Sequence, residues 1–456
     1  MTDLPSIKKI YFLGIGGIGM SALARYFKYQ GVEVSGYDKT KTPLTEELIK
    51  EGISVHYEED ISALAADIDL VVYTPAVPKE HKEYLYFIKN NFPIKKRSEV
   101  LGLITKDRYT IAVSGTHGKT TITSMIAHIL KESKKDVISF IGGISKNYKS
   151  NLILSKENKI AVVEADEFDR SFLQLHPDIA IISSMDADHL DIYGNQNYLI
   201  DSFRMFANQT RKNGKIFFKK GLALNNLTAV AHTYSAFENA DYSAKDVQIK
   251  KGYFYFSISG PEGFNLAVKL GVPGLHNVEN AIVASAVALN MGVKPNEIKK
   301  ALASYTGVVR RFDYRIQKEK LIYIDDYAHH PQEIKACIQA ARELYPEKKI
   351  TGVFQPHLFS RTRDLIQGFA ESLALLDELI LLDIYPAREK PIEGVTSQML
   401  CEKINMKNKM VCKKENLVEE LIKRKLDVLI TIGAGDIDQL VLPIEKSLLN
   451  MLKISQ

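Results

Sequence analysis

The chain has 456 residues, of which 45% are hydrophobic and 25% are charged, a composition typical of a globular protein with several domains. No apolar run reaches the ~18 residues that a membrane-spanning helix needs, and the first residues, MTDLPSIKKI, do not resemble a secretion signal. The three cysteines are scattered, and the net charge of +5 is dispersed rather than gathered in a basic stripe. We therefore expect a cytoplasmic protein with no nucleic-acid partner and no membrane insertion.

Short β-branched runs alternate with amphipathic segments of helical length, which predicts an α/β fold built on parallel sheets. The expected strands are residues 9–14, 70–75, 109–115, 159–166, 179–184, 321–326, 349–355, 379–385 and 428–435. Between these, residues 211–275 lose the helical periodicity and predict an irregular, β-rich region. New strand–loop–helix patterns begin near residues 103–108 and 305–313, so we expect domains at 1–105, 106–308 and 309–456.

The first expected strand leads into a glycine-rich loop, in the segment IYFLGIGGIGMSALARYF. Gly14, Gly16 and Gly19 form the pattern G-x-G-x-x-G, and Asp38 follows the next apolar run. This spacing is that of a dinucleotide-binding loop, in which a helix N-terminus faces a pyrophosphate and the acidic residue binds a ribose. Taken alone, the loop favours a nicotinamide- or flavin-dependent oxidoreductase.

A second glycine-rich loop, GTHGKTT, lies between the expected strand 109–115 and a helical pattern. Its backbone amides can surround phosphate oxygens, and Lys119 adds a full positive charge. Thr120 offers a hydroxyl to Mg²⁺. The strict P-loop pattern would require glycine at Val113, so the loop departs from that pattern while keeping its chemistry. The sequence therefore predicts a nucleoside triphosphate site, which would also suit a P-loop motor or helicase.

Two acidic clusters follow later strands, as a metal-dependent triphosphate site requires. The first contains Glu164, Asp166, Glu167 and Asp169, and the second contains Asp186, Asp188, His189 and Asp191. Mg²⁺ prefers oxygen ligands, so His189 implies either a second metal position or a role in supporting the ligands or capping a helix.

Further polar groups gather in the last part of the chain. His276, Asn277 and Asn280 begin an alanine-rich helical segment, where they could bind adenosine or cap the helix. Arg310 and Arg311 suit phosphate oxygens. The remaining polar groups follow two expected strands: Asp325, Asp326, His329 and His330 after the first, and Gln355, His357 and Arg361 after the second. His329 and His330 have no third metal ligand at short spacing, so a zinc site is not expected.

These motifs together resemble those of the Mur ligases. The resemblance covers the whole chain, through GIGGIGMSALA, GTHGKTT, EADEFDRSF, DADHLDIYG, HNVENAIVA, RRFDYR, DDYAHHP and FQPH..SRT. It implies a Rossmann-like N-terminal domain, a central P-loop ATPase-like domain and a C-terminal α/β domain that closes over the site. The implied reaction joins L-alanine to the lactyl carboxylate of UDP-N-acetylmuramate through an acyl phosphate, with release of ADP and phosphate. The alternative within the same superfamily is a recycling ligase that adds a whole tripeptide.

The resemblance also implies residue roles, with ATP and Mg²⁺ as cofactors and either a monomer or a weak homodimer. Catalysis would involve Lys119, Glu164, His189 and His329, and the metals would bind Thr120, Glu164 and His189. ATP would contact Gly115, Thr116, His117, Gly118, Lys119, Thr120, Thr121, His276, Asn280, Arg311 and Asp325. The substrates would contact Gly14, Gly16, Gly17, Gly19, His329 and Arg361, which gives the first loop a UDP diphosphate and removes Asp38 from any nicotinamide site.

Two positions depart from the pattern common in these ligases. Ala328 stands where many members have glycine, and Leu358 stands where they have arginine. The second change removes a cation that would face the amino-acid carboxylate. Arg361 or Arg363 could replace it.

Overall fold

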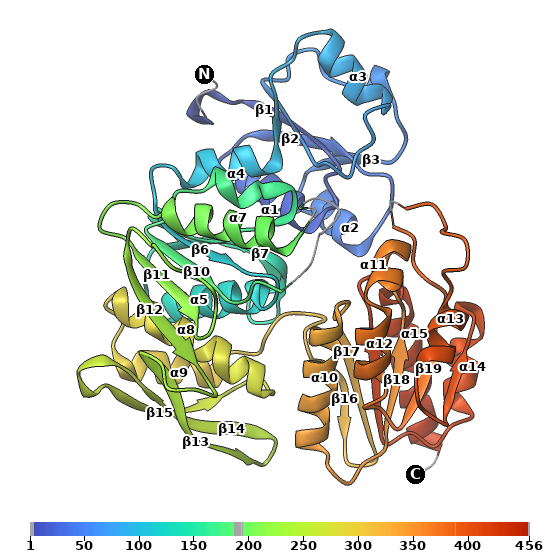
Figure 1. Ribbon diagram of the computed structural model, residues 1–456. Helices are drawn as coiled ribbons and strands as arrows, with labels where there is room; N and C mark the ends of the chain where they lie inside the picture. Colours follow the sequence, from blue (N-terminus) through green and yellow to red (C-terminus); the bar gives the residue numbers. More distant parts are fainter. Residues whose placement is uncertain (1–3, 187–192, 194, 388, 455–456) are drawn as a thin grey trace. The chain divides into compact units, whose positions relative to one another are not determined.

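The computed structural model describes residues 4–186, 193, 195–387 and 389–454, and these form three sheets with flanking helices (Figure 1). The chain forms two compact units. One contains residues 1–247, 255–271 and 279–306, and the other contains residues 248–254, 272–278 and 307–456. The first unit holds two sheets and the second holds one.

The first sheet is parallel, with strand order β3-β2-β1-β4-β5, and α1 follows β1 directly through the first glycine-rich loop. β1 is buried almost throughout, in keeping with its uninterrupted apolar sequence. Its elements are β1 (Lys9–Leu13), α1 (Ile18–Tyr29), β2 (Glu33–Tyr37), α2 (Pro43–Lys50), β3 (Ser54–His56), β4 (Leu70–Tyr73), α3 (Lys82–Lys89), β5 (Ile94–Lys96) and α4 (Arg97–Thr105).

The second sheet has ten strands, in the order β15-β14-β13-β12-β11-β10-β6-β9-β7-β8. The β-rich region expected at 211–275 is present, and its five strands extend the central sheet itself. The elements are β6 (Tyr109–Ser114), α5 (Lys119–Glu132), β7 (Val137–Ser145), β8 (Ser150–Ile153), β9 (Ile160–Glu164), β10 (Ile179–Ile182), α7 (Gln196–Asn208), β11 (Lys215–Lys219), β12 (Val230–Ser235), β13 (Tyr242–Lys250), β14 (Tyr253–Ser259), β15 (Asn265–Leu270), α8 (Leu275–Asn290) and α9 (Pro295–Ser304).

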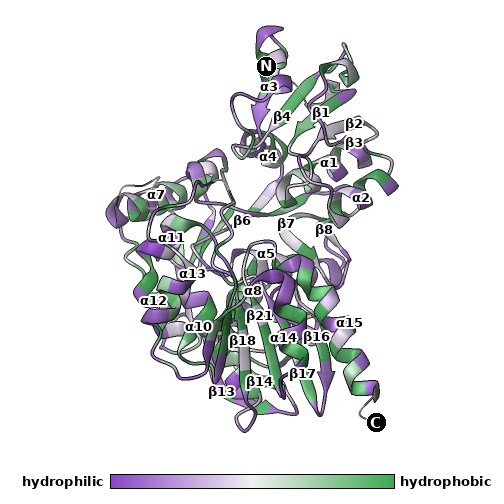
Figure 2. Cartoon of the chain, turned by 90° about the vertical axis from the view of Figure 1, so that its right-hand side faces the viewer, coloured by the Kyte–Doolittle hydropathy of each residue, from purple (hydrophilic) through white to green (hydrophobic). Residues whose placement is uncertain are grey.

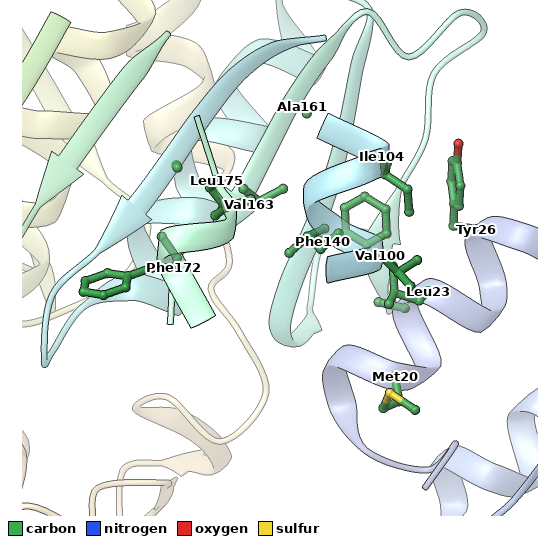
Figure 3. Close-up of a cluster of buried hydrophobic side chains, with 14 of the residues drawn as sticks. Met20, Leu23, Tyr26, Val100, Ile104, Phe140, Ala161, Val163, Phe172 and Leu175 are labelled. Carbon is green, nitrogen blue, oxygen red and sulfur yellow. The ribbon is translucent and has the colours of Figure 1, made fainter. Parts of the chain in front are cut away.

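An apolar cluster joins the first two sheets into one unit. Figure 3 shows Met20, Leu23 and Tyr26 on α1 beside Val100 and Ile104 on α4, in the same buried cluster as side chains of β7 and β9. Burying such side chains contributes roughly 1.5–3 kcal/mol each. The two glycine-rich loops therefore belong to one packed unit.

The third sheet has the strand order β16-β17-β21-β18-β19-β20, with β16 antiparallel to β17. Figure 2 shows hydrophobic residues along its inner strands β18 and β21, which are buried over their whole length. The elements are β16 (Asp313–Lys318), β17 (Leu321–Asp326), α10 (Pro331–Leu344), β18 (Ile350–Phe354), α11 (Phe359–Asp364), α12 (Ile366–Leu373), β19 (Glu378–Leu381), α13 (Ser397–Lys403), β20 (Lys409–Val411), α14 (Leu417–Ile422), β21 (Val428–Ile432) and α15 (Asp438–Ile454).

Each predicted strand is present, and most ends agree within one or two residues. β17 begins and ends at the predicted residues 321 and 326. The strands predicted at 379–385 and 428–435 end earlier, at Leu381 and Ile432. The second strand ends where Gly433, with φ +150°, begins a loop. Among the described residues, no helix is both long and apolar enough to cross a membrane.

Candidate active site

The loop between β6 and α5 has the backbone geometry of an anion-binding turn. Gly115 has φ +129° and Gly118 has φ +84°, and a Cβ atom on Gly115 would lie 2.2 Å from the Ser183 hydroxyl. The loop is tied to the end of β10, since the His117 amide donates to the Ser184 hydroxyl at 2.8 Å. The amides in the first turn of α5, which contains Thr120 and Thr121, have no carbonyl acceptor within the helix.

Lys119 is the first residue of α5, and its ammonium group is held by the chain itself. Nζ donates to the Glu167 carboxylate at 2.8 and 3.0 Å and to the Gly115 carbonyl at 2.7 Å. Burial by itself would lower the pKa of Lys119, but the nearby carboxylates of Glu167, Asp166 and Glu164 together outweigh burial and raise that pKa. Lys119 is therefore charged at neutral pH. The sequence pattern identified Glu167 only as one member of an acidic cluster.

Glu164 lies at the end of β9 and faces the same turn. Its carboxylate accepts hydrogen bonds from the Thr120 hydroxyl at 3.2 Å and from the Gly142 amide at 2.5 Å. A hydroxyl and a carboxylate oxygen side by side at a phosphate-binding loop are ligands that suit Mg²⁺. His189, Asp188 and Asp191 lie outside the described residues. Asp186 has a carboxylate oxygen 3.3 Å from His117 Nε2.

The helix α8 carries the predicted adenosine-binding residues. Asn280 lies beside the phosphate-binding turn, where its Oδ1 would be 3.1 Å from a Cβ atom on Gly118. His276 belongs to the second unit. Burial, helped by the charge of Arg311, lowers the pKa of His276 to about 4, so its ring is neutral near pH 7. Asn277 donates to the Pro273 carbonyl and thereby fixes the start of the helix.

Several amides of the first glycine-rich loop have acceptors within the loop's own surroundings. The amides of Gly14 and Ile15 donate to the Tyr37 carbonyl, and the Gly17 amide donates to the Gly14 carbonyl. The Gly16 amide donates to the Asp38 carboxylate at 2.8 Å. Asp38 thus supports the loop from within, and the first-turn amides of α1, from Ile18 onward, are those left without a carbonyl of the helix.

Arg97, the first residue of α4, lies against this loop and was missed in the sequence. Its Nη1 and Cδ atoms would both be 3.1 Å from a Cβ atom on Gly19. Within the described part of the chain, the Arg97 side chain has no hydrogen bond or ion pair. The segment IKKRSE gave no signal, because only the folded chain brings the guanidinium group to the loop.

In the second unit, Asp325 pairs with Arg310. Arg310 Nε donates to Asp325 Oδ2 at 3.0 Å, and the Thr431 hydroxyl donates to Oδ1 at 2.7 Å. Arg310 Nη2 also donates to the Gly433 carbonyl. This network fixes the carboxyl ends of β17 and β21, with the Arg310 and Arg311 guanidinium groups each 5.2 Å from the Tyr327 ring centre.

Glu333, on α10, connects two predicted site residues. Its carboxylate lies 3.8 Å from Arg311 Nη1 and accepts the His329 amide at 3.1 Å. Burial lowers the pKa of His329, the nearby charge of Arg361 acts in the same direction, and Glu333 opposes them. The ring centres of His329 and His357 lie 6.1 Å apart, so the loops that follow β17 and β18 are neighbours. His330 instead caps α10 by accepting the Gln332 amide.

Both residues that depart from the common pattern, Leu358 and Ala328, are buried and hydrogen-bonded through their backbone amides. Leu358 is buried and has φ +69°, and its amide donates to the Tyr385 carbonyl. Of the two arginines that follow, Arg361 contributes through its charge to the lowered pKa of His329, whereas Arg363 is exposed and pairs with Asp364. Ala328 is buried, and its amide donates to Asp326 at 2.8 Å.

Comparison with known families accounts for nearly all of these motifs. The families described as "Mur ligase family, catalytic domain", "Mur ligase middle domain" and "Mur ligase, glutamate ligase domain" match residues 9–109, 113–288 and 310–436. A Flavobacterium johnsoniae protein named UDP-N-acetylmuramate–L-alanine ligase is 51% identical over 98% of this chain and 99% of its own length.

The chain belongs to the Mur ligase family. A ligase of the same name from Parabacteroides distasonis is 48% identical over 99% of both chains. The crystal structure of a UDP-N-acetylmuramate–alanine ligase from Thermotoga maritima superposes with a TM-score of 0.82 at 29% identity, over 98% of this chain and 100% of the other. The three sheets are those of the three-domain Mur ligase architecture, which confirms the predicted fold class.

Proposed function

We propose that this Mur ligase catalyses the ATP-dependent addition of L-alanine to UDP-N-acetylmuramate in peptidoglycan synthesis. The observation that carries the proposal is 51% identity across 98% of the chain to a ligase named for that reaction. The β6–α5 loop supports it, because Lys119, Thr120 and Glu164 meet there at a helix N-terminus. A helix N-terminus with a lysine and a hydroxyl beside it is suited to bind the phosphate groups of ATP.

The reaction must turn a carboxylate into an electrophile. Transfer of the γ-phosphoryl group of ATP to the lactyl carboxylate gives an acyl phosphate, and attack by the alanine amine releases phosphate and forms the amide. Two anionic groups must approach each other in the first step. We assign Lys119 to the phosphate oxygens, where its positive charge offsets this repulsion and stabilises the transition state.

Mg²⁺ is the metal that we propose for this site, held by Thr120 and Glu164. A hydroxyl and a carboxylate oxygen in contact, beside a phosphate loop, fit its preference for oxygen ligands. When bound, the metal supplies charge neutralisation at the phosphate oxygens. His189 remains our proposal for a second position, and Asn280 and His276 for the adenosine.

We assign the first loop to the UDP diphosphate and the C-terminal residues to the acid and amine substrates. Gly14 has φ +84°, a Cβ atom on Gly16 would lie 2.8 Å from the Asp38 carboxylate, and Gly19 leaves room for Arg97. Gly17 is the residue that precedes the first turn of α1. Arg311 and Asp325 are proposed to complete the nucleotide site. His329 and Arg361 are proposed for alanine and the lactyl carboxylate, and the lowered pKa of His329 makes it able to accept a proton only weakly.

The decisive experiment measures phosphate release with UDP-N-acetylmuramate, ATP and Mg²⁺, with and without L-alanine. We expect release to require L-alanine and the product to carry one alanine by mass spectrometry. The tripeptide of the recycling ligases, offered in place of alanine, should give no release above background. Release with the tripeptide but not with alanine would overturn the proposal.

We also propose that the enzyme acts in the cytoplasm, as a monomer or a weak homodimer. Its proposed substrates, ATP and a UDP-linked sugar, are made there, and its three cysteines are free and buried. Light scattering over a range of protein concentrations measures the state of association, and cell fractionation measures the location.

A further inference from the structure

The carboxylate of Glu167 lies directly behind the proposed phosphate-binding lysine. Both of its oxygens accept hydrogen bonds from Lys119 Nζ, at 2.8 and 3.0 Å, and the residue is 1% exposed. We propose that Glu167 is a positioning residue that keeps its hold on Lys119 while the ammonium group contacts the phosphates of ATP. The inference rests on the proposed function and adds a residue to which the family motifs gave no role.

Burial makes this pair difficult to separate. Among the residues that the structure describes, Lys119 is the only side chain that donates a hydrogen bond to the Glu167 carboxylate. If Lys119 turned fully toward a phosphate, a carboxylate cut off from water would lose its counter-charge, which is strongly unfavourable. The ammonium group therefore reaches the ligand without leaving Glu167.

One of the three ammonium protons of Lys119 can be transferred from its present acceptor to a hydrogen bond with a phosphate oxygen. An ammonium group has three donors. Here they serve the Glu167 carboxylate, the Gly115 carbonyl at 2.7 Å and the Thr116 carbonyl at 3.5 Å. The contact with Thr116 is the longest, so it is the one that a phosphate oxygen displaces most easily.

The backbone of Glu167 is itself fixed in place. Its carbonyl accepts the Tyr193 hydroxyl at 2.5 Å and the Arg170 amide at 3.0 Å. Asp169 and Arg170 follow with φ of 55° and 52°, a left-handed pair that turns the chain sharply away. This anchoring places the carboxylate before ATP arrives, so little ordering remains for the catalytic step.

The opposite role would be a latch that holds Lys119 away from ATP. The two roles differ in the sign of one measurement. A positioning residue, when neutralised, lowers kcat with a small change in the KM for ATP. A latch, when neutralised, frees Lys119 and lowers the KM for ATP.

The experiment compares Glu167→Gln with the matched control Glu157→Gln in the full-length protein. Glu157 also pairs with a lysine, Lys159, but at an exposed position. Alanine-dependent phosphate release should show kcat about 100-fold lower in Glu167→Gln, with the KM for ATP raised no more than about threefold. The Glu157→Gln protein should match the wild type. A kcat within about twofold of the wild type, or a lowered KM for ATP, would overturn the proposal.

A second measurement is independent of activity. Lys119→Ala strands the buried carboxylate and should lower the melting temperature, and adding Glu167→Gln to that variant should restore most of the loss. The double variant should also be no less active than Lys119→Ala alone, because the two residues act as one unit. Additive losses in both stability and rate would contradict the pairing. Wild-type protein without alanine-dependent turnover would instead defeat the proposed function, while the melting series would still test the pair.

Discussion

Two glycine-rich loops in one packed unit share a plan and differ in their charges. Each connects a buried parallel strand to the N-terminus of a helix of at least twelve residues. The β6–α5 loop places Lys119 in its helix and has Glu164 and Glu167 beside it. The β1–α1 loop has no lysine, and its charged neighbours are Asp38, which binds the loop amide, and Arg97.

This difference suits the first loop to substrate binding and the second loop to the phosphoryl-transfer reaction. A diphosphate that only needs to be held is satisfied by helix-terminal amides and one planar cation. A triphosphate that must transfer its terminal group needs a side-chain cation and metal ligands, together with carboxylates that keep the cation in place. The first loop alone resembles an NAD-binding loop because the pattern of glycines describes the turn and not the ligand.

The largest expected effect is at Lys119. Lys119→Ala removes the only side-chain cation of the second loop, so we expect kcat to fall by about 10³-fold. The KM for UDP-N-acetylmuramate should change little, since the first loop is intact. Alanine-dependent phosphate release measures both. An active variant would show that the second loop does not supply the catalytic charge while the first loop only binds substrate.

The metal ligands should give the next largest effect. Glu164→Gln keeps the shape of the side chain but removes the charge beside Thr120, and we expect about a 100-fold loss of kcat together with a higher Mg²⁺ requirement. Titration of activity with Mg²⁺, after removal of metal with a chelator, measures that requirement. Unchanged Mg²⁺ dependence would remove Glu164 from the metal site.

The sequence predicted the second loop more completely than the first. Lys119, Thr120 and Glu164 lie within short motifs, and their chemistry follows from residue type and from the strand ends that carry them. Arg97 was missed because its place beside Gly19 depends on how α4 packs against α1. Pairing of Lys119 with Glu167 rather than with another acid of the cluster likewise depends on the turn at Asp169 and Arg170.

For secondary structure and sheet topology, too, local features were predicted from the sequence and long-range ones were not. The strands at 109–115 and 159–166 were predicted because a short apolar run indicates a buried strand from neighbouring residues alone. The extension of the central sheet by β11–β15 could not be predicted, since strand order is set by contacts between distant segments. The same limit applies to Asp325, whose bond to Arg310 and Thr431 joins three separate parts of the third sheet.

Arg97→Ala tests the first loop by its binding alone. The guanidinium group has no partner within the described residues, so its loss should leave stability nearly unchanged. We expect the KM for UDP-N-acetylmuramate to rise about tenfold, while kcat and the KM for ATP stay within about twofold. Arg363→Ala, at an exposed position, is the control. A fall in kcat without a change in KM would place Arg97 in the chemistry rather than in substrate binding.

The smallest expected effect is at Asp38, and it distinguishes support of the loop from contact with a ligand. The carboxylate accepts the Gly16 amide at 2.8 Å and the Thr40 amide at 3.0 Å. Asp38→Asn keeps one acceptor oxygen and loses the charge, so we expect unfolding to become easier by about 1 kcal/mol. The KM for UDP-N-acetylmuramate should change by less than about threefold, because Asp38 acts on the loop and not on the ligand. Denaturant unfolding and steady-state kinetics measure the two quantities, and a large rise in KM at unchanged stability would return Asp38 to the role of a ribose ligand.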